Sequence, residues 1–85
     1  MKINAMETNT TELLSRIVIN DKVLAGKPII RGFRISVEQI LKSLAAGNLE
    51  AEILKDFPEL EHDDIRACLL YAANMLEDEK IYKVA

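Results

Sequence analysis

The fold is decided by residues 36–69, which read SVEQILKSLAAGNLEAEILKDFPELEHDDIRACL. Ser36 stands three residues before Gln39, the spacing of a capping box, in which the two side chains satisfy free N–H groups at a helix start. Gly47 suits the left-handed position that follows a helix. Between these signals, apolar side chains recur at helical spacing, namely Val37, Ile40, Leu41, Leu44 and Ala45. The pattern predicts a first helix between Ser36 and Gly47.

Two further helices are predicted after short connections. Asn48 is expected to cap the second helix. Pro58 is expected to end it, because proline disfavours the α conformation of the residue before it. The third helix is predicted to start within residues 61–63, where acidic side chains suit the positive end of the helix dipole. Its apolar stripe comprises Ile65, Cys68, Leu69, Ala72 and Leu76, widened by Leu70 and Ala73.

Two short strands are predicted before the helices. Residues 16–21 are rich in β-branched side chains and end in an Asn-Asp turn signal. A loop follows, in which Gly26 is expected to supply a positive φ. Residues 29–35 then form a second short strand or extended stretch, interrupted by Gly32. The sequence therefore predicts a mainly α domain, with a trihelical helix-turn-helix arrangement and a short N-terminal β-hairpin.

Length and composition indicate one small globular domain. The chain has 85 residues, of which 49% are hydrophobic and 29% charged, a balance that excludes disorder over the whole chain. Residues 16–80 are predicted to form the domain, residues 1–15 a flexible N-terminal tail and residues 81–85 a C-terminal tail. A single cysteine, no secretory signal and no apolar run long enough for a membrane predict a cytoplasmic protein.

Charge is distributed unevenly along the chain. Residues 16–34 carry five basic residues against one acidic residue, a net charge of +4, whereas residues 49–85 carry four against ten, a net charge of −6. Such asymmetry indicates two surfaces with different partners. The alternative is that solvated faces of opposite charge are merely segregated along the chain.

The sequence gives little support for an enzyme. His62 has no partner with metal-ligand spacing, and a zinc site needs three or four ligands. Cys68 lies on the apolar stripe without a basic neighbour one helical turn away, so it is interpreted as a core residue. We therefore expect no catalytic residue, no metal and no cofactor.

Basic side chains are the candidates for binding. A helix-turn-helix suggests DNA, but the start of the third helix is acidic and would repel phosphates, with Arg66 as its one helpful cation. Contact with nucleic acid or with a protein partner is therefore assigned to Lys22, Lys27, Arg31 and Arg34, together with Arg66. The alternative is that Arg31 or Arg34 pairs with helix acids inside the fold.

Residues 26–37, GKPIIRGFRISV, resemble the G-K-P-x-I-R-G-T-R-I-x-V signature of the bacterial and archaeal domain-of-unknown-function family 433 (DUF433). The similarity continues to about residue 73, and Phe33 replaces the usual threonine. It implies a homeodomain-like or winged-helix-like fold. It also implies a VapB-type antitoxin encoded beside a PIN-like ribonuclease toxin.

The resemblance and the split charge together predict a non-enzymatic antitoxin that neutralises a PIN-like toxin and represses its own operon on operator DNA. Arg31 and Arg34 are the candidates for entering the acidic, Mg²⁺-binding pocket of the nuclease. One alternative is a stand-alone DNA-binding regulator, and another is a small structural module.

A homodimer is also predicted. A two-stranded hairpin is marginal alone, and its unpaired edges would be covered by the same strands of a second chain. The predicted interface comprises Ile17, Ile19, Ile30 and Phe33. The alternative is a monomer whose hairpin packs on its own helices.

Overall fold

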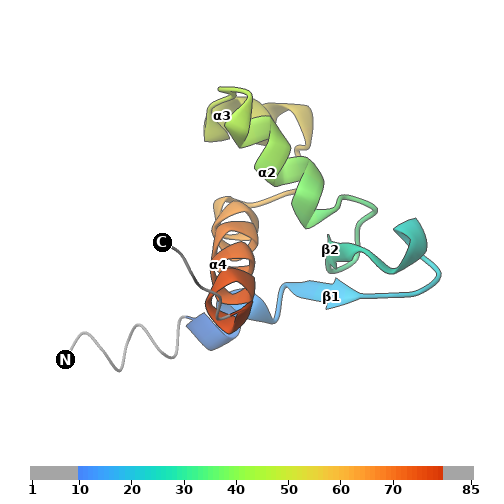
Figure 1. Cartoon of the computed structure of the whole chain (residues 1–85). Helices are drawn as coiled ribbons and strands as arrows, with labels where there is room; N and C mark the ends of the chain where they lie inside the picture. Colours follow the sequence, from blue (N-terminus) through green and yellow to red (C-terminus); the bar gives the residue numbers. More distant parts are fainter. Residues whose placement is uncertain (1–9, 80–85) are drawn as a thin grey trace.

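The computed structural model of the chain describes residues 10–79 (Figure 1). In chain order, its elements are strand β1 (Ile17–Ile19), a short turn (Leu24–Gly26), strand β2 (Pro28–Ile30) and helices α2 (Val37–Ala45), α3 (Glu50–Asp56) and α4 (His62–Glu79). The prediction of a mainly helical small domain with a short N-terminal two-stranded antiparallel hairpin is confirmed. None of the helices in residues 10–79 combines the length and apolarity needed to cross a bilayer.

The N-terminal boundary of the packed region lies earlier than the sequence indicated. Residues 10–14 are helical, and the Leu13 side chain is 6% exposed. The part of the predicted tail that the structure describes is therefore helical, with Leu13 buried. Residues 1–9 and the predicted tail at 81–85 lie outside the described residues.

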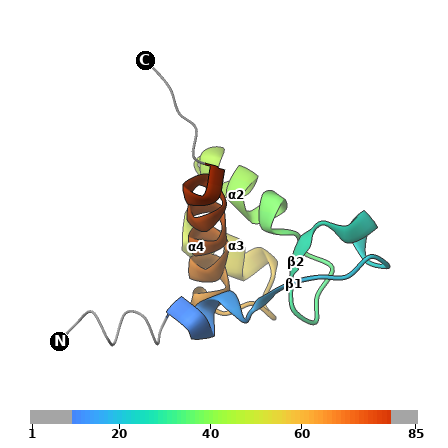
Figure 2. The same ribbon diagram turned by 60° about the horizontal axis from the view of Figure 1, so that its bottom comes forward.

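The hairpin is antiparallel, with Ile17 opposite Ile30 and Ile19 opposite Pro28. Beyond β2 the chain turns back on itself, because the Ile30 N–H donates to the Ile35 carbonyl at 3.0 Å and Ser36 forms a bridge with Ile29. The predicted extended stretch 29–35 is thus a strand followed by a tight turn. Figure 2 shows the hairpin to one side of the helices.

Helix α2 has the predicted cap at Ser36 and the predicted glycine after its end, and of the two hydrogen bonds of the predicted capping box the structure shows the one from the Gln39 N–H. The Ser36 hydroxyl accepts from the Gln39 N–H at 3.0 Å, which caps the start. At the other end, the N–H groups of Gly47 and Asn48 donate to the carbonyls of Leu44 and Ser43, which is a Schellman motif. Gly47 has φ +98°, a conformation that other residues adopt only with strain.

The start of α3 differs from the prediction. Leu49, not Asn48, holds the capping position, and its N–H donates to the Glu52 carboxylate at 2.7 Å. The Asn48 amide instead donates to the Ser43 hydroxyl at 2.9 Å, back across the turn. The prediction that Asn48 caps the helix is therefore wrong. The end of α3 just before Pro58 is confirmed.

The core lies where the three helices meet the hairpin. Its fully buried members include Ile40 of α2, Ile53 of α3 and Ile65 of α4, each at most 2% exposed. The interpretation of Cys68 as a core residue is confirmed, since its side chain is 0% exposed. Leu69 and Leu76, which the sequence placed on the same stripe, are 45% and 71% exposed, so the core does not cover that side of α4.

The turn between the strands has an unusual backbone. Leu24, Ala25 and Gly26 have φ values of +50°, +57° and +79°. The sequence predicted the positive φ of Gly26 but gave no sign of the other two, because leucine and alanine rarely adopt this conformation. The turn therefore carries strain at two residues.

Replacing Ala25 by glycine is expected to relieve part of this strain. Ala25→Gly should raise the free energy of unfolding by about 1 kcal/mol, since glycine adopts a positive φ without a Cβ clash. Urea denaturation measures the change. The matched control is Ala51→Gly at an exposed position of helix α3, which should lower the free energy of unfolding by about 1 kcal/mol. An equal loss in both variants would contradict the prediction.

Candidate functional site

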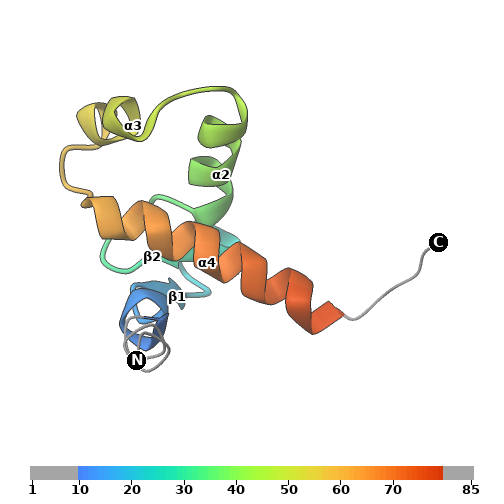
Figure 3. The same cartoon turned by 90° about the vertical axis from the view of Figure 1, so that its left-hand side faces the viewer.

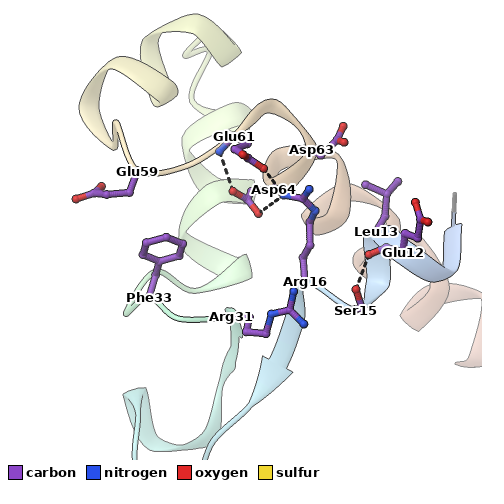
Figure 4. A pocket seen from close by; sticks show the side chains of 10 residues that line it. All are labelled: Glu12, Leu13, Ser15, Arg16, Arg31, Phe33, Glu59, Glu61, Asp63 and Asp64. Atoms are coloured by element: carbon purple, nitrogen blue, oxygen red, sulfur yellow. Dashed lines mark hydrogen bonds and ion pairs between the residues drawn. The ribbon is translucent and has the colours of Figure 1, made fainter.

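A polar pocket of about 530 Å³ lies where the N-terminal helical residues, the turn after β2 and the start of α4 meet (Figure 4). Both signs of charge line it, together with one aromatic ring. The lining residues are Glu12, Leu13, Ser15, Arg16, Arg31, Phe33, Glu59, Glu61, Asp63 and Asp64.

Arg16 is the central side chain of this pocket. One guanidinium nitrogen, Nη1, lies 2.9 Å from Glu61 Oε1 and 3.0 Å from Asp64 Oδ1. The second Asp64 oxygen accepts from the Glu61 N–H at 2.7 Å, at the first turn of α4. The hydrogen bond to Glu61, followed by that to Asp64, raises the pKa of Arg16 above its ordinary value. The Asp64 side chain is 8% exposed, so its charge depends on Arg16 for compensation.

The turn at residues 31–34 presents two free guanidinium groups. Gly32 has φ +87°, and the Phe33 N–H donates to the Ile30 carbonyl at 3.0 Å. Arg31 and Arg34 on either side of this bend are exposed, and neither forms an ion pair with any residue in 10–79. The alternative that Arg31 or Arg34 pairs with helix acids is therefore wrong for this part of the chain.

The helix acids are instead bound by Arg16, which sequence reasoning counted only as one of five basic residues. Its partners lie 45 and 48 positions away, and no local pattern marks such a pairing. Phe33 is half-buried and packs against the core while also lining the pocket. Figure 4 shows Arg31 and Phe33 pointing in different directions from the same turn.

The remaining predicted contact residues are dispersed. Lys27 lies 3.0 Å from Glu38, which Lys42 also contacts at 3.0 Å. These two ammonium groups, Lys27 first, lower the pKa of Glu38. Arg66 lies 3.1 Å from Asp63 on its own helix. Lys22 is exposed and has no ion pair with another described residue. Three of the five predicted cations are therefore unpaired among the described residues, namely Lys22, Arg31 and Arg34.

The four residues predicted for a dimer interface differ in how far their side chains are exposed. Ile30 is 1% exposed within a single chain, so its assignment to an interface is wrong. Ile17 and Phe33 are half-buried against the core. Ile19 is 60% exposed, at the end of β1. The turn back at Ile35 already pairs with Ile30, so the open edge of the hairpin is that of β1.

Other titratable groups in residues 10–79 lie outside this pocket. No group of three or more His, Cys, Asp or Glu side chains in this part of the chain is arranged to hold a metal ion. His62 Nδ1 lies 2.7 Å from Glu50 Oε1, a contact between the starts of α4 and α3. Burial, with a smaller contribution from Asp64, raises the pKa of Cys68 to about 12.

Removing the Arg16 guanidinium is expected to destabilise the domain. Arg16→Met should lower the free energy of unfolding by about 2 kcal/mol, because the nearly buried Asp64 carboxylate loses a charged hydrogen bond. Urea denaturation at neutral pH gives the value. Arg34→Met is the matched control and should change stability by less than about 0.5 kcal/mol, since that side chain is exposed. Equal effects of the two substitutions would refute the role of Arg16.

The buried thiol predicts a dependence of stability on alkaline pH. Its pKa rises from an ordinary 9.0 to about 12 on folding. Between these values the unfolded chain releases the thiol proton and the folded chain keeps it, so stability falls as pH rises. Urea denaturation between pH 8 and pH 11 should therefore show a steeper decline for the native chain than for Cys68→Ala. Parallel declines would show that the thiol ionises equally in both states.

Comparison with known proteins finds similarity both in sequence and in fold. It is 36% identical over 59 residues to the uncharacterized protein y4eO of Sinorhizobium fredii; the match covers 68% of this chain and 27% of that relative, so the chain spans about a quarter of the relative's length. The crystal structure of a DUF433 member protein from Anabaena variabilis superposes with a TM-score of 0.71 at 25% identity, covering 89% of this chain and 75% of that one.

The family profile described as "Protein of unknown function (DUF433)" matches residues 17–72. That range contains β1, β2, α2, α3 and the first part of α4, including Arg31, Gly32 and the acids that bind Arg16. With two thirds of its length matched by the profile, this chain belongs to the DUF433 family.

Proposed function

We propose that the chain is a non-enzymatic antitoxin of the VapB type, which binds and neutralises a PIN-like ribonuclease. The observation that carries this proposal is the pair of exposed guanidinium groups of Arg31 and Arg34 on one tight turn, neither of which is paired with another residue in 10–79. An arginine free of internal partners can form a bidentate pair with a carboxylate of another molecule at full strength.

The backbone that carries these two arginines is held in place. The Arg31 N–H donates to the Arg16 carbonyl at 2.7 Å, and the Phe33 N–H to the Ile30 carbonyl at 3.0 Å. Phe33 packs against the core between them. A turn fixed in this way loses little backbone entropy on binding, which favours affinity.

The chemistry of the proposed partner fits such a turn. A PIN-like nuclease holds Mg²⁺ with clustered carboxylates, and an inserted guanidinium competes for the same oxygens. The acidic second half of our chain, with a net charge of −6 over residues 49–85, complements the basic surface on which a ribonuclease holds RNA. Neutralisation in this proposal takes place in the cytoplasm, by occupation of the active site.

Operator binding and operon repression form a second part of the proposal, with weaker support. The homeodomain-like or winged-helix-like assignment would make α4 the recognition helix. Its start carries Asp63 and Asp64, and its cation Arg66 is bound to Asp63. Lys27 is likewise bound to Glu38. These contacts disfavour phosphate binding by α4, so we place protein binding before DNA binding.

Co-expression with the product of the adjacent gene tests the proposal. The native chain should co-purify with that product and inhibit its ribonuclease activity. The double variant Arg31→Glu/Arg34→Glu should lose at least about 100-fold in affinity, since each charged hydrogen bond contributes about 1.5–3 kcal/mol. Binding is measured by titration calorimetry on the purified pair.

A matched control separates this effect from general electrostatics. Lys55→Glu on α3 reverses one exposed charge away from the turn and should change the affinity less than about threefold. A neighbouring product that is not a nuclease, or that does not bind, would refute the antitoxin role. Binding to upstream DNA in a gel shift, with loss of affinity at higher salt, would favour the regulator instead.

A further inference from the structure

Helix α4 has an apolar face that the rest of the chain leaves uncovered. Leu69, Ala73 and Leu76 on this face are exposed, with Leu69 at 45% and Leu76 at 71%. Arg66 precedes them on the same face. The four positions, 66, 69, 73 and 76, follow one another at intervals of three, four and three residues. This alternation is the spacing by which one helix packs along another.

The position of the helix makes this face accessible. Figure 3 shows the C-terminal half of α4 extending past α2 and the hairpin. On the side toward α2, an apolar groove of about 530 Å³ continues the surface, lined by Leu41, Ala45, Tyr71, Ala72, Met75 and Leu76 among others. Leu76 belongs to both surfaces. A partner helix lying on α4 would therefore cover the exposed face and the edge of this groove together.

We propose that the occupant is α4 of a second copy of this chain, packed antiparallel about a two-fold axis. In an antiparallel pair that preserves the three–four spacing, Leu69 lies against the partner's Ala73, and the partner's Leu69 lies against Ala73. A large side chain thus meets a small one twice, so the two helices interdigitate. The face is complementary to itself, as a two-fold interface requires.

Charge selects the antiparallel direction. Glu77 follows Leu76 near the end of the helix and is exposed, and the last turn contains no basic residue, although the dipole favours cations there. In the antiparallel pair, Arg66 packs its methylene groups on the partner's Leu76, which directs its guanidinium toward the acidic end of the partner helix. A parallel pair would bring the two Arg66 side chains together, and the two acidic ends as well. Arg66 is half-exposed, and its contact with Asp63 one turn away is the ion pair that it would exchange for the contact with the partner helix.

This interface differs from the hairpin interface that the sequence suggested. Ile30 is buried within the chain, and Ile35 and Ser36 already cover the inner edge of β2. The α4 face leaves the turn at residues 31–34 untouched. The dimer therefore does not depend on the proposed antitoxin role, and each can fail without the other.

Sedimentation equilibrium at micromolar concentration tests the interface. The native chain should have a mass of twice 9.6 kDa, and Leu76→Asp should have 9.6 kDa with unchanged helical circular dichroism, because Leu76 is too exposed to be needed for folding. The matched control is Leu49→Asp, the same change at a leucine of 67% exposure at the start of α3, which should remain a dimer. A monomeric native chain, a dimeric Leu76→Asp variant or a dimer broken by Ile19→Asp would each overturn the proposal.

Cysteine cross-linking tests the direction of the helices. A mixture of Leu69→Cys and Ala73→Cys chains should form disulfide-linked heterodimers faster than either variant forms homodimers. In a parallel pair each variant would instead link most readily to itself, which would overturn the antiparallel arrangement. The native Cys68 does not interfere, because it is buried and its pKa is about 12.

Discussion

The interaction on which the rest of the structure depends is the contact of Arg16 with Glu61 and Asp64 (Figure 4). It joins the entry of β1 to the first turn of α4, between residues that are 45 and 48 positions apart in the sequence. The same residue accepts the Arg31 N–H on its carbonyl, and Asp64 also accepts the Glu61 N–H. One arginine and one carboxylate therefore fix the start of a helix, the entry of a strand and the turn that carries Arg31.

This arrangement explains how opposite charges share one surface without cancelling. Asp64 is nearly buried and is satisfied by Arg16 and by a backbone N–H, so it does not attract the arginines of the neighbouring turn. Arg31 and Arg34 remain available to another molecule. Had either of them bound Asp64, the turn would have lost its charge to an internal ion pair. The acidic helix start is thus bound within the domain, whereas the intermolecular role of the arginine turn is our proposal.

The parts of the fold that the sequence predicted are those set by neighbours a few residues apart. Ser36 caps the start of α2, Gly47 follows its end, and Pro58 stops α3. Each of them acts on a backbone group within about five positions. Arg16 has partners 45 and 48 positions away, and its role could not be found without the fold. Leu24 and Ala25 were missed for the opposite reason, since their positive φ contradicts their own preference. The predicted cap of α3, Asn48, and the observed cap, Leu49, are neighbours, and the ends of helices commonly shift by one or two residues.

The two proposed surfaces lie toward opposite ends of α4. Asp64 lines the pocket beside the arginine turn, and Leu76 lies twelve residues further on, about 18 Å along the helix axis. Asp63 connects them, because it lines the pocket and also binds Arg66. If Arg66 turns to the partner helix, the Asp63 carboxylate is left free at the pocket rim, where it weakens the field of Arg31 toward an acidic ligand. In a chain that uses both proposed surfaces, dimer formation and binding at the arginine turn would be coupled through Asp63, and each would disfavour the other.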